Sequence, residues 1–217
     1  MTSNTAKILL ALGAFALGTQ GLAQAEPKTE AATSEVATVG EKAPDFVLTD
    51  IHGKNHTLKG YAGRYVVLEW VNFGCPFVRK HYDSDNLQTL QSTYIGKDVV
   101  WLSICSSVSG KQGHFEGEEL TKQVVEVNGS KATAYLTDPE GTVGRAYGAK
   151  ATPHMFVIDP KGTLIYAGAI DNRPTTDKGD IKGATNYVRA ALDAAMAGKK
   201  VETTVTQAYG CSVKYKQ

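Results

Sequence analysis

The chain has 217 residues, 42% of them hydrophobic, with 23 lysines and arginines against 22 aspartates and glutamates. Because nucleic acids and anionic membranes select basic surfaces, the formal net charge of +1 argues against both as partners. The length is sufficient for one domain with an ample core, and the three cysteines cannot all be paired within one chain.

The first 25 residues have the pattern of a secretory signal peptide. Lys7 is their only charged residue, an apolar run over 8–17 follows it, and Ala23-Gln24-Ala25 comes last. The run is too short to span a bilayer, and Ala-x-Ala is typical of a cleavage site. We therefore expect a mature chain that begins near Glu26, has no membrane association and is periplasmic or secreted, where disulfides persist. A retained amphipathic helix is the alternative.

A flexible leader and a β-hairpin are expected next. Residues 26–40 are rich in Ala, Thr, Glu and Ser without apolar periodicity, so the folded domain should begin at residue 41. Residues 43–48 and 55–58 flank a turn centred on Gly53, which predicts a hairpin. His52 and His56 lie in it, and we interpret them as surface polar residues because no further metal ligands are near them in the sequence.

The central stretch is residues 65–78, with the sequence Tyr-Val-Val-Leu-Glu-Trp-Val-Asn-Phe-Gly-Cys-Pro-Phe-Val. Its β-branched and aromatic first half predicts a buried strand that ends at Gly74. Apolar residues then recur at helical spacing as far as Tyr94, with Pro76 in the first turn. Cys75 would therefore sit at a helix start, where the helix dipole favours the nucleophilic thiolate. An inert core cysteine is the alternative.

This stretch resembles the active-site segment of the thioredoxin-like superfamily, in particular of redoxin or peroxiredoxin-like (alkyl hydroperoxide reductase/thiol-specific antioxidant) proteins. The resemblance implies an α/β thioredoxin-like fold, with a central mixed sheet flanked by helices, and thiol redox chemistry without a cofactor. It puts Cys75 in the place of the attacking cysteine and Val78 in that of the second cysteine of Cys-x-x-Cys. The Pro-x-x-x-Thr-x-x-Cys pattern of true peroxiredoxins is absent, which leaves the choice between a disulfide and a peroxide substrate open.

A second buried strand is predicted over 98–105. If it runs parallel to the first, its end carries Cys105 to the edge of the sheet where Cys75 lies. An unreactive buried thiol is the preferred interpretation of Cys105. Residues 106–117 contain three glycines and predict a mobile loop at the mouth of the site. A helix over 118–128 should follow, with an apolar face made by Leu120, Val124 and Val127.

The Thr152-Pro153 pair lies between a short predicted helix (142–147) and a strand that begins after it. In thioredoxin-like proteins a Thr-Pro here carries a cis peptide that faces the active cysteine, so the resemblance implies that Thr152 and Pro153 position the substrate. Physically, a cis bond bends the chain sharply and leaves backbone groups available to an incoming strand. A trans loop proline is the alternative. His154 is interpreted as a simple strand-start residue.

The remainder of the chain predicts a hairpin, a last helix and a tail. The turn Asp159-Pro160-Lys161-Gly162 joins the hairpin strands, and Asp180 is expected to cap a helix that ends near Gly198. The domain is thus expected to cover 41–198. The tail, 199–217, is expected to let Cys211 swing in and out at low cost, and its Gly210-Cys211 pair resembles the carboxyl-terminal Gly-Cys of the peroxiredoxin-like group.

These observations predict an exported thiol-disulfide oxidoreductase or peroxiredoxin-like enzyme that uses Cys75 as nucleophile. With Val78 in the place of the usual partner, Cys211 is the preferred resolving thiol, and a Cys75–Cys105 bridge or an intermolecular link is the alternative. Expected partners are a protein thiol, a protein disulfide or a peroxide, and an electron-donating thiol protein. A non-catalytic binding module with structural cysteines remains the alternative function. A copper site is disfavoured, because Cys75 and His81 lack a second cysteine between them.

Overall fold

The computed structural model describes residues 1–2 and 36–217. The predicted cleavage site before Glu26 and nearly all of the predicted leader lie outside the described residues. Residues 36–217 belong to a single compact unit. Among the described residues, no helix combines the length and the apolar content that a bilayer span needs.

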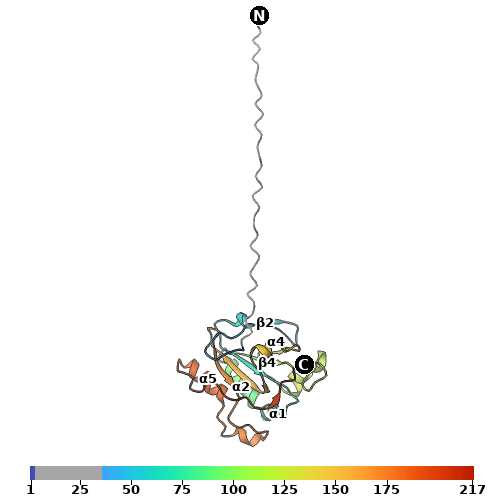
Figure 1. Cartoon of the computed structure of the whole chain (residues 1–217), viewed down its shortest axis with the longest axis vertical. Helices are drawn as coiled ribbons and strands as arrows, with labels where there is room; N and C mark the ends of the chain where they lie inside the picture. The colour runs from blue at the N-terminus through green and yellow to red at the C-terminus, as the bar shows by residue number, and fades with distance from the viewer. Residues whose placement is uncertain (3–35) are drawn as a thin grey trace. The chain divides into compact units, whose positions relative to one another are not determined.

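A mixed seven-stranded sheet forms the centre of this unit, in the order β2-β1-β5-β4-β3-β7-β8 (Figure 1). The three middle strands β5, β4 and β3 are parallel, whereas β1, β2, β7 and β8 each pair antiparallel. The sheet confirms the predicted α/β thioredoxin-like architecture. Its strands are β1 (Val47–Asp50), β2 (Asn55–Thr57), β3 (Val66–Trp70), β4 (Val100–Cys105), β5 (Ala134–Thr137), β7 (His154–Ile158) and β8 (Leu164–Gly168).

Both faces of the sheet are covered. Every residue of β3, β4 and β7 is buried, which is what their β-branched and aromatic composition predicts. Side chains alternate between two apolar clusters, so that Val67 packs on one face and Leu68 on the other. The first cluster receives α1 (Pro76–Tyr82), α2 (Asn86–Ile95), α3 (Gly117–Lys122) and α5 (Tyr187–Met196), and the second receives α4 (Thr142–Ala146).

The predicted amino-terminal hairpin is β1 and β2, followed by a short 3₁₀ turn, η1 (Lys59–Tyr61). His52 is exposed, as expected. The surface assignment of His56 is wrong, because only 6% of it is exposed and its Nε2 lies 2.8 Å from Asp50 Oδ2. The ring is buried against β1 and held between Asp50 and the hydroxyl of Tyr61.

The helical segment after Cys75 is divided in two. Residues 83–85 form a turn in which Asp85 adopts a left-handed conformation, with φ of 55°. The apolar positions on either side of this turn still pack on one core, which is why their spacing looks continuous in the sequence.

Two further helix predictions need correction. The segment after α3 is a π-helix over Gln123–Val127, and its wider turn leaves Val127 54% exposed, whereas Leu120 and Val124 are buried as predicted. Asp180 does not cap the last helix, because it lies in the 3₁₀ helix η3 (Lys178–Ile181) and accepts from Thr175. Asn186 caps α5 instead, by accepting from the amide of Arg189 at 2.8 Å.

The carboxyl-terminal tail is packed along the domain. Its strand β9 (Cys211–Ser212) pairs antiparallel with β6 (Ala151–Thr152), and the two form a second, two-stranded sheet. Val205 forms a bridge with Ala167 of β8. In Figure 1 the red end of the chain runs close to the start of α1. The tail is therefore part of the structure around Cys75.

Candidate active site

Cys75 is the residue before the first turn of α1, at the end of the segment that connects β3 to this helix. Its backbone is extended, with φ of −82° and ψ of 125°, and Pro76 occupies the first helical position, where a missing N–H costs no hydrogen bond. The sulfur thus lies at the positive end of the helix, as predicted. The side chain is completely buried, with 0% of it exposed.

The Thr152–Pro153 peptide is cis, in agreement with what the resemblance implies. It brings the Thr152 carbonyl against Cys75, and the Cys75 thiol donates to this oxygen at 3.1 Å. Thr152, one of the two residues expected to position a substrate, is therefore in direct contact with the sulfur that was expected to attack it.

The tail brings the third element to this point. Cys211 is paired with Thr152 across the β6–β9 ladder, and its backbone amide donates to Cys75 Sγ at 3.4 Å. Gly210 makes this approach possible, because its φ is 127° and a Cβ there would lie 2.0 Å from the Thr152 carbonyl oxygen. Cys75, Thr152, Pro153 and Cys211 thus form one site from three distant segments.

The environment separates the two thiols chemically. Burial alone would raise the pKa of Cys75, but hydrogen bonds from the side chains of Cys211 and Thr152 and from the amides of Val78 and Cys211 bring it below its usual value. Burial raises the pKa of Cys211 to about 11, and the neighbouring Cys75 adds to this effect. Cys75 is therefore the more acidic thiol of the pair, and Cys211 keeps its proton to a higher pH.

Cys105 is buried at the end of β4, and its thiol is directed at the Gly113 carbonyl at 3.4 Å. It lines a separate cavity of about 220 Å³ together with Leu120, Tyr135 and the loop around His114. Among the described contacts, none joins Cys105 to Cys75 or Cys211. The parallel strands bring Cys105 to the expected edge of the sheet, but its side chain belongs to another cavity.

The loop over 106–117 borders the site, as its place after β4 predicts. Gln112 Nε2 donates to the Gly74 carbonyl at 2.7 Å, and Asn72 Nδ2 donates to the Gln112 carbonyl at 3.0 Å. These two bonds tie the middle of the loop to the residues just before Cys75. The loop thus supports the segment that carries the thiolate.

The AhpC/TSA family model matches residues 39–167, which is more than half of the chain. The chain belongs to the AhpC/TSA family. This finding confirms the resemblance stated from the active-site segment. It also confirms the predicted class of thiol-disulfide oxidoreductase or peroxiredoxin-like enzyme at the level of the family. The matched segment contains Cys75, Thr152 and Pro153 but ends before Cys211 of this AhpC/TSA protein.

Curated relatives of this AhpC/TSA protein are named as thiol-disulfide oxidoreductases. ResA of Geobacillus thermodenitrificans is 28% identical over 127 residues, which is 58% of this chain and 66% of the relative. ResA of Bacillus cereus is 27% identical over 131 residues, which is 60% of this chain and 69% of the relative. The match thus spans about two thirds of the length of these relatives.

Two solved structures are similar over most of the chain. A hypothetical protein from Sinorhizobium meliloti 1021 is 30% identical with a TM-score of 0.72, and the match covers 84% of this chain and 97% of that one. An uncharacterized conserved protein from Geobacillus kaustophilus is 29% identical with a TM-score of 0.69, and the match covers 82% and 93%. Both matches extend well beyond the AhpC/TSA segment.

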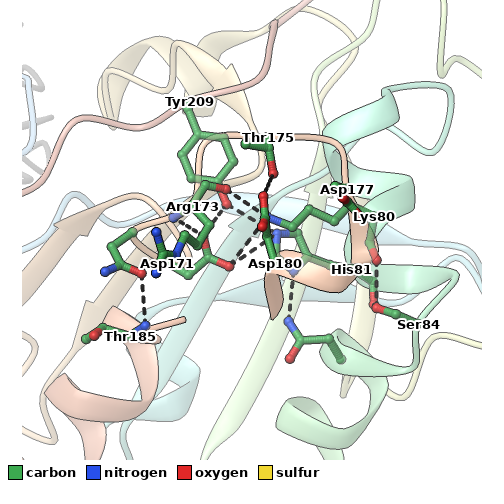
Figure 2. Close-up of polar contacts among 12 residues, drawn as sticks. Lys80, His81, Ser84, Asp171, Arg173, Thr175, Asp177, Asp180, Thr185 and Tyr209 are labelled. Carbon is green, nitrogen blue, oxygen red and sulfur yellow. Dashed lines mark hydrogen bonds and ion pairs between the residues drawn. The ribbon is translucent and has the colours of Figure 1, made fainter. Parts of the chain in front are cut away.

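A buried polar cluster beside the site was not predicted from the sequence. Tyr209, two positions before Cys211, donates its hydroxyl to Asp171 Oδ1 at 2.6 Å, as Figure 2 shows. His81 Nε2 lies 3.3 Å from the same hydroxyl, and Lys80 Nζ lies 3.9 Å from Asp171 Oδ2. These residues come from α1, from the segment after β8 and from the tail, so no local pattern links them.

His81 is neutral in this cluster. Burial lowers its pKa to about 4, and the charge of Lys80 acts in the same direction, while Asp171 opposes both. Asn86 Nδ2 donates to His81 Nδ1 at 2.8 Å, so the ring proton lies on Nε2. His81 can therefore donate to the oxygen of Tyr209 while Tyr209 donates to Asp171.

Glu69 is a second feature of the AhpC/TSA protein that the sequence analysis missed. It is completely buried in β3, and four groups donate to its carboxylate at 2.8–3.1 Å, those of Tyr82, Gln91, Trp101 and Ser103. Burial nevertheless raises the pKa of this carboxyl. The only sequence signal was an acidic residue inside an otherwise apolar strand.

Clusters suited to a metal ion are absent from the part of the chain that the structure describes, where no three His, Cys, Asp or Glu side chains converge.

Proposed function

We propose that the protein is an exported thiol-dependent oxidoreductase in which Cys75 attacks the substrate and Cys211 resolves the product. The observation that carries this proposal is the contact between the Cys211 amide and Cys75 Sγ at 3.4 Å. It puts a second thiol-bearing residue at the sulfur of the thiolate, in a chain that has Val78 in the usual place of the partner. Thr152 and Pro153 hold the backbone edge beside both residues.

With a disulfide substrate, the Cys75 thiolate attacks one sulfur, the substrate disulfide breaks, and the released substrate sulfur leaves as a thiolate. Cys211 then loses its proton and attacks Cys75 Sγ, which forms the Cys75–Cys211 disulfide and releases the second substrate sulfur. A dithiol reductant restores both thiols. Two electrons pass from that reductant to the substrate in each cycle.

With a peroxide, the Cys75 thiolate attacks one oxygen and becomes a sulfenic acid, and an alcohol or water leaves after taking up a proton. The Cys211 thiol then condenses with the sulfenic acid, and water is released as the disulfide forms. The same pair of cysteines therefore serves either substrate.

The raised pKa of Cys211 fits its later role in both routes. Part of that rise comes from the hydrogen bond and the negative charge of Cys75. Once Cys75 is bonded to substrate sulfur or to oxygen, its charge is gone, and Cys211 loses its proton more easily. Cys211 thus keeps its proton until Cys75 has reacted with the substrate.

The proposed partners are a protein thiol or disulfide, or a peroxide, and an electron-donating thiol protein. The periplasmic or secreted location rests on the signal-peptide pattern of residues 1–25. It agrees with a function in which disulfides are formed or broken.

Peptide mapping under non-reducing conditions tests the proposal. The fully reduced protein is treated with one equivalent of hydrogen peroxide or of oxidised glutathione, and we expect a Cys75–Cys211 peptide with both oxidants. Cys105→Ser should give the same peptide and serves as the matched control. Cys211→Ser should instead accumulate a sulfenic acid or a glutathione adduct on Cys75.

A Cys75–Cys105 peptide, or a dimer linked through Cys211, would contradict the assignment. A Cys75–Cys211 bridge that thiol reductants fail to reopen would favour structural cysteines in a binding module. The ratio of the second-order rate constants for the two oxidants then decides between peroxide reduction and disulfide exchange.

A further inference from the structure

Residues 209–213, here called the strap, cover Cys75. Cys211 of the strap is paired with Thr152, and Cys75 itself is completely buried. A sulfur can attack or be attacked only when its partner can reach it. While the strap is in place, neither Cys75 nor the backbone edge of Thr152 is accessible to an external molecule.

The strap is held at both ends. After Cys211, the Val213 amide donates to the Lys150 carbonyl at 3.2 Å. Before Cys211, Tyr209 donates to Asp171 at 2.6 Å, and its ring packs edge-on against Phe77 with centroids 5.8 Å apart. A hydrogen bond to a carboxylate is stronger than one between neutral groups, so Tyr209 makes the stronger of these two bonds.

The acceptor of this bond remains satisfied when Tyr209 leaves. Asp171 Oδ1 also accepts from the Arg173 amide at 2.8 Å, and Asp171 Oδ2 lies 3.9 Å from both Lys80 Nζ and His81 Nε2. The costly event in a buried site is to leave a charge without partners. Here Asp171 keeps these partners. Release of Tyr209 costs its bond to Asp171, the weaker bond from His81 Nε2 at 3.3 Å, and the contacts of its ring with Phe77 and Lys80 Nζ.

We propose that Tyr209 is a latch whose release lifts the strap from Cys75 and frees the Thr152 edge for an extended segment of a partner protein. The proposal rests on the proposed role of Cys75 and adds a regulation of access to it. The chemical class of the partner follows from the site that the strap occupies. β9 pairs with the Thr152 edge through backbone hydrogen bonds and places a cysteine next to Cys75. An extended polypeptide that contains a cysteine can pair with the same edge and place its own cysteine there.

Alkylation of Cys75 measures the opening directly. The reduced full-length protein is treated with iodoacetamide, and the modification of each cysteine is followed by mass spectrometry at several pH values, so that accessibility is separated from thiolate content. Tyr209→Phe keeps the ring and removes the hydroxyl. Since a hydrogen bond to a charged group is worth enough to shift an equilibrium by about tenfold or more, we expect Cys75 to react about tenfold faster.

Tyr94→Phe is the matched control, because Tyr94 also donates to a carboxylate, Asp193 Oδ1, at 2.8 Å. It should leave the rate at Cys75 unchanged. Cys105 is an internal control in every sample, because it is buried without contact to the strap. An unchanged Cys75 rate in Tyr209→Phe, or an equal rise at Cys105, would overturn the latch.

A second variant disturbs the strap and leaves the Tyr209 hydroxyl in place. Gly210→Ala places a Cβ against the Thr152 carbonyl and should also raise the Cys75 rate, whereas Gly183→Ala, which has a positive φ but open space around it, should not. Failure of this pair would overturn the proposal too. The alkylation rates test the latch and require no disulfide. The peptide map tests the Cys75–Cys211 assignment, so the failure of either proposal can be recognised separately.

Discussion

The backbone amide of Cys211 points at the sulfur of Cys75 from 3.4 Å, although 136 positions separate the two residues in the chain. A backbone N–H directed at a sulfur stabilises the thiolate. Because the same residue also carries a thiol, one strand supplies both the stabilising donor and the proposed resolving group. The electrostatics and the chemistry of the pair are therefore coupled.

The two thiols should titrate in opposite directions from their usual values. The pKa of Cys75 is lowered by hydrogen bonds that outweigh burial, and that of Cys211 is raised to about 11. The pH midpoint of alkylation should therefore lie below the ordinary cysteine range for Cys75 and near 11 for Cys211. Residue-resolved alkylation from pH 5 to 11 measures both, and a Cys211 midpoint at or below that of Cys75 would contradict the assignment of the thiolate.

Gly113→Ala should detach the loop over 106–117 from the site. The φ of Gly113 is 84°, and a Cβ there would lie 2.2 Å from Asn72 Oδ1. We expect a loss of about 1–3 kcal/mol in the free energy of unfolding, measured by urea denaturation, because the Asn72–Gln112 bond cannot persist. Gly110→Ala is the control, since its φ is 77° but its surroundings are open. Equal losses in the two variants would show that backbone strain alone is responsible.

Glu69 should make the protein less stable as the pH rises. Its folded-state pKa lies above the usual value of 4.5 because burial disfavours the charge. The folded state therefore holds this proton more tightly than the unfolded state does, and stability decreases as the pH rises above 4.5. The free energy of unfolding of wild type, minus that of Glu69→Gln, should decrease between pH 4 and pH 7. A difference that increases with pH would show that the four donors outweigh burial.

His154, in contrast to Glu69, should make the protein less stable as the pH falls. Burial lowers its pKa from 6.5 to about 4, and Lys150 adds to the shift. The stability that depends on a neutral ring is present above pH 6.5 and is lost as the pH falls toward 4, by up to about 3 kcal/mol. His154→Asn should lose less stability than wild type between pH 7 and pH 4.5. His52→Asn, at an exposed turn, should follow wild type, and parallel curves for His154→Asn and wild type would exclude this role.

The mature protein should begin near Glu26. The prediction depends on the apolar run and the Ala-x-Ala triplet of the first 25 residues. Intact-mass measurement of protein exported from its native host tests it. A mass that retains Met1 would refute it.

The parts of the fold that the sequence predicted are those set by local composition. The strands around Val67 and Trp101 are dense in β-branched and aromatic residues, and their parallel pairing follows from the helical segment between them. Boundaries inside helical segments were less predictable. The break at Asp85 and the π-helical turn before Val127 leave the apolar spacing almost unchanged, so the hydrophobic pattern does not reveal them.

For the site, the sequence indicated the reacting groups but not what holds them. Cys75, Thr152 and Cys211 each have a local signature, such as a neighbouring glycine or proline. The Tyr209–Asp171 bond joins residues 38 positions apart, and the His81–Tyr209 contact joins residues 128 positions apart. Hydrogen bonds at such separations depend on tertiary packing, which a single sequence does not show. The burial of His56 was missed for the same reason.

The complete burial of Cys75 also affects how long the protein survives oxidants. A cysteine oxidised once to sulfenic acid is lost for good when a second oxidant molecule converts it to sulfinic acid. With the strap closed, the group nearest to the Cys75 sulfur is a neighbouring residue that carries a thiol, and solvent is excluded. Under the proposed mechanism, a strap that closes again after the first oxidation therefore favours the reversible disulfide over the irreversible acid.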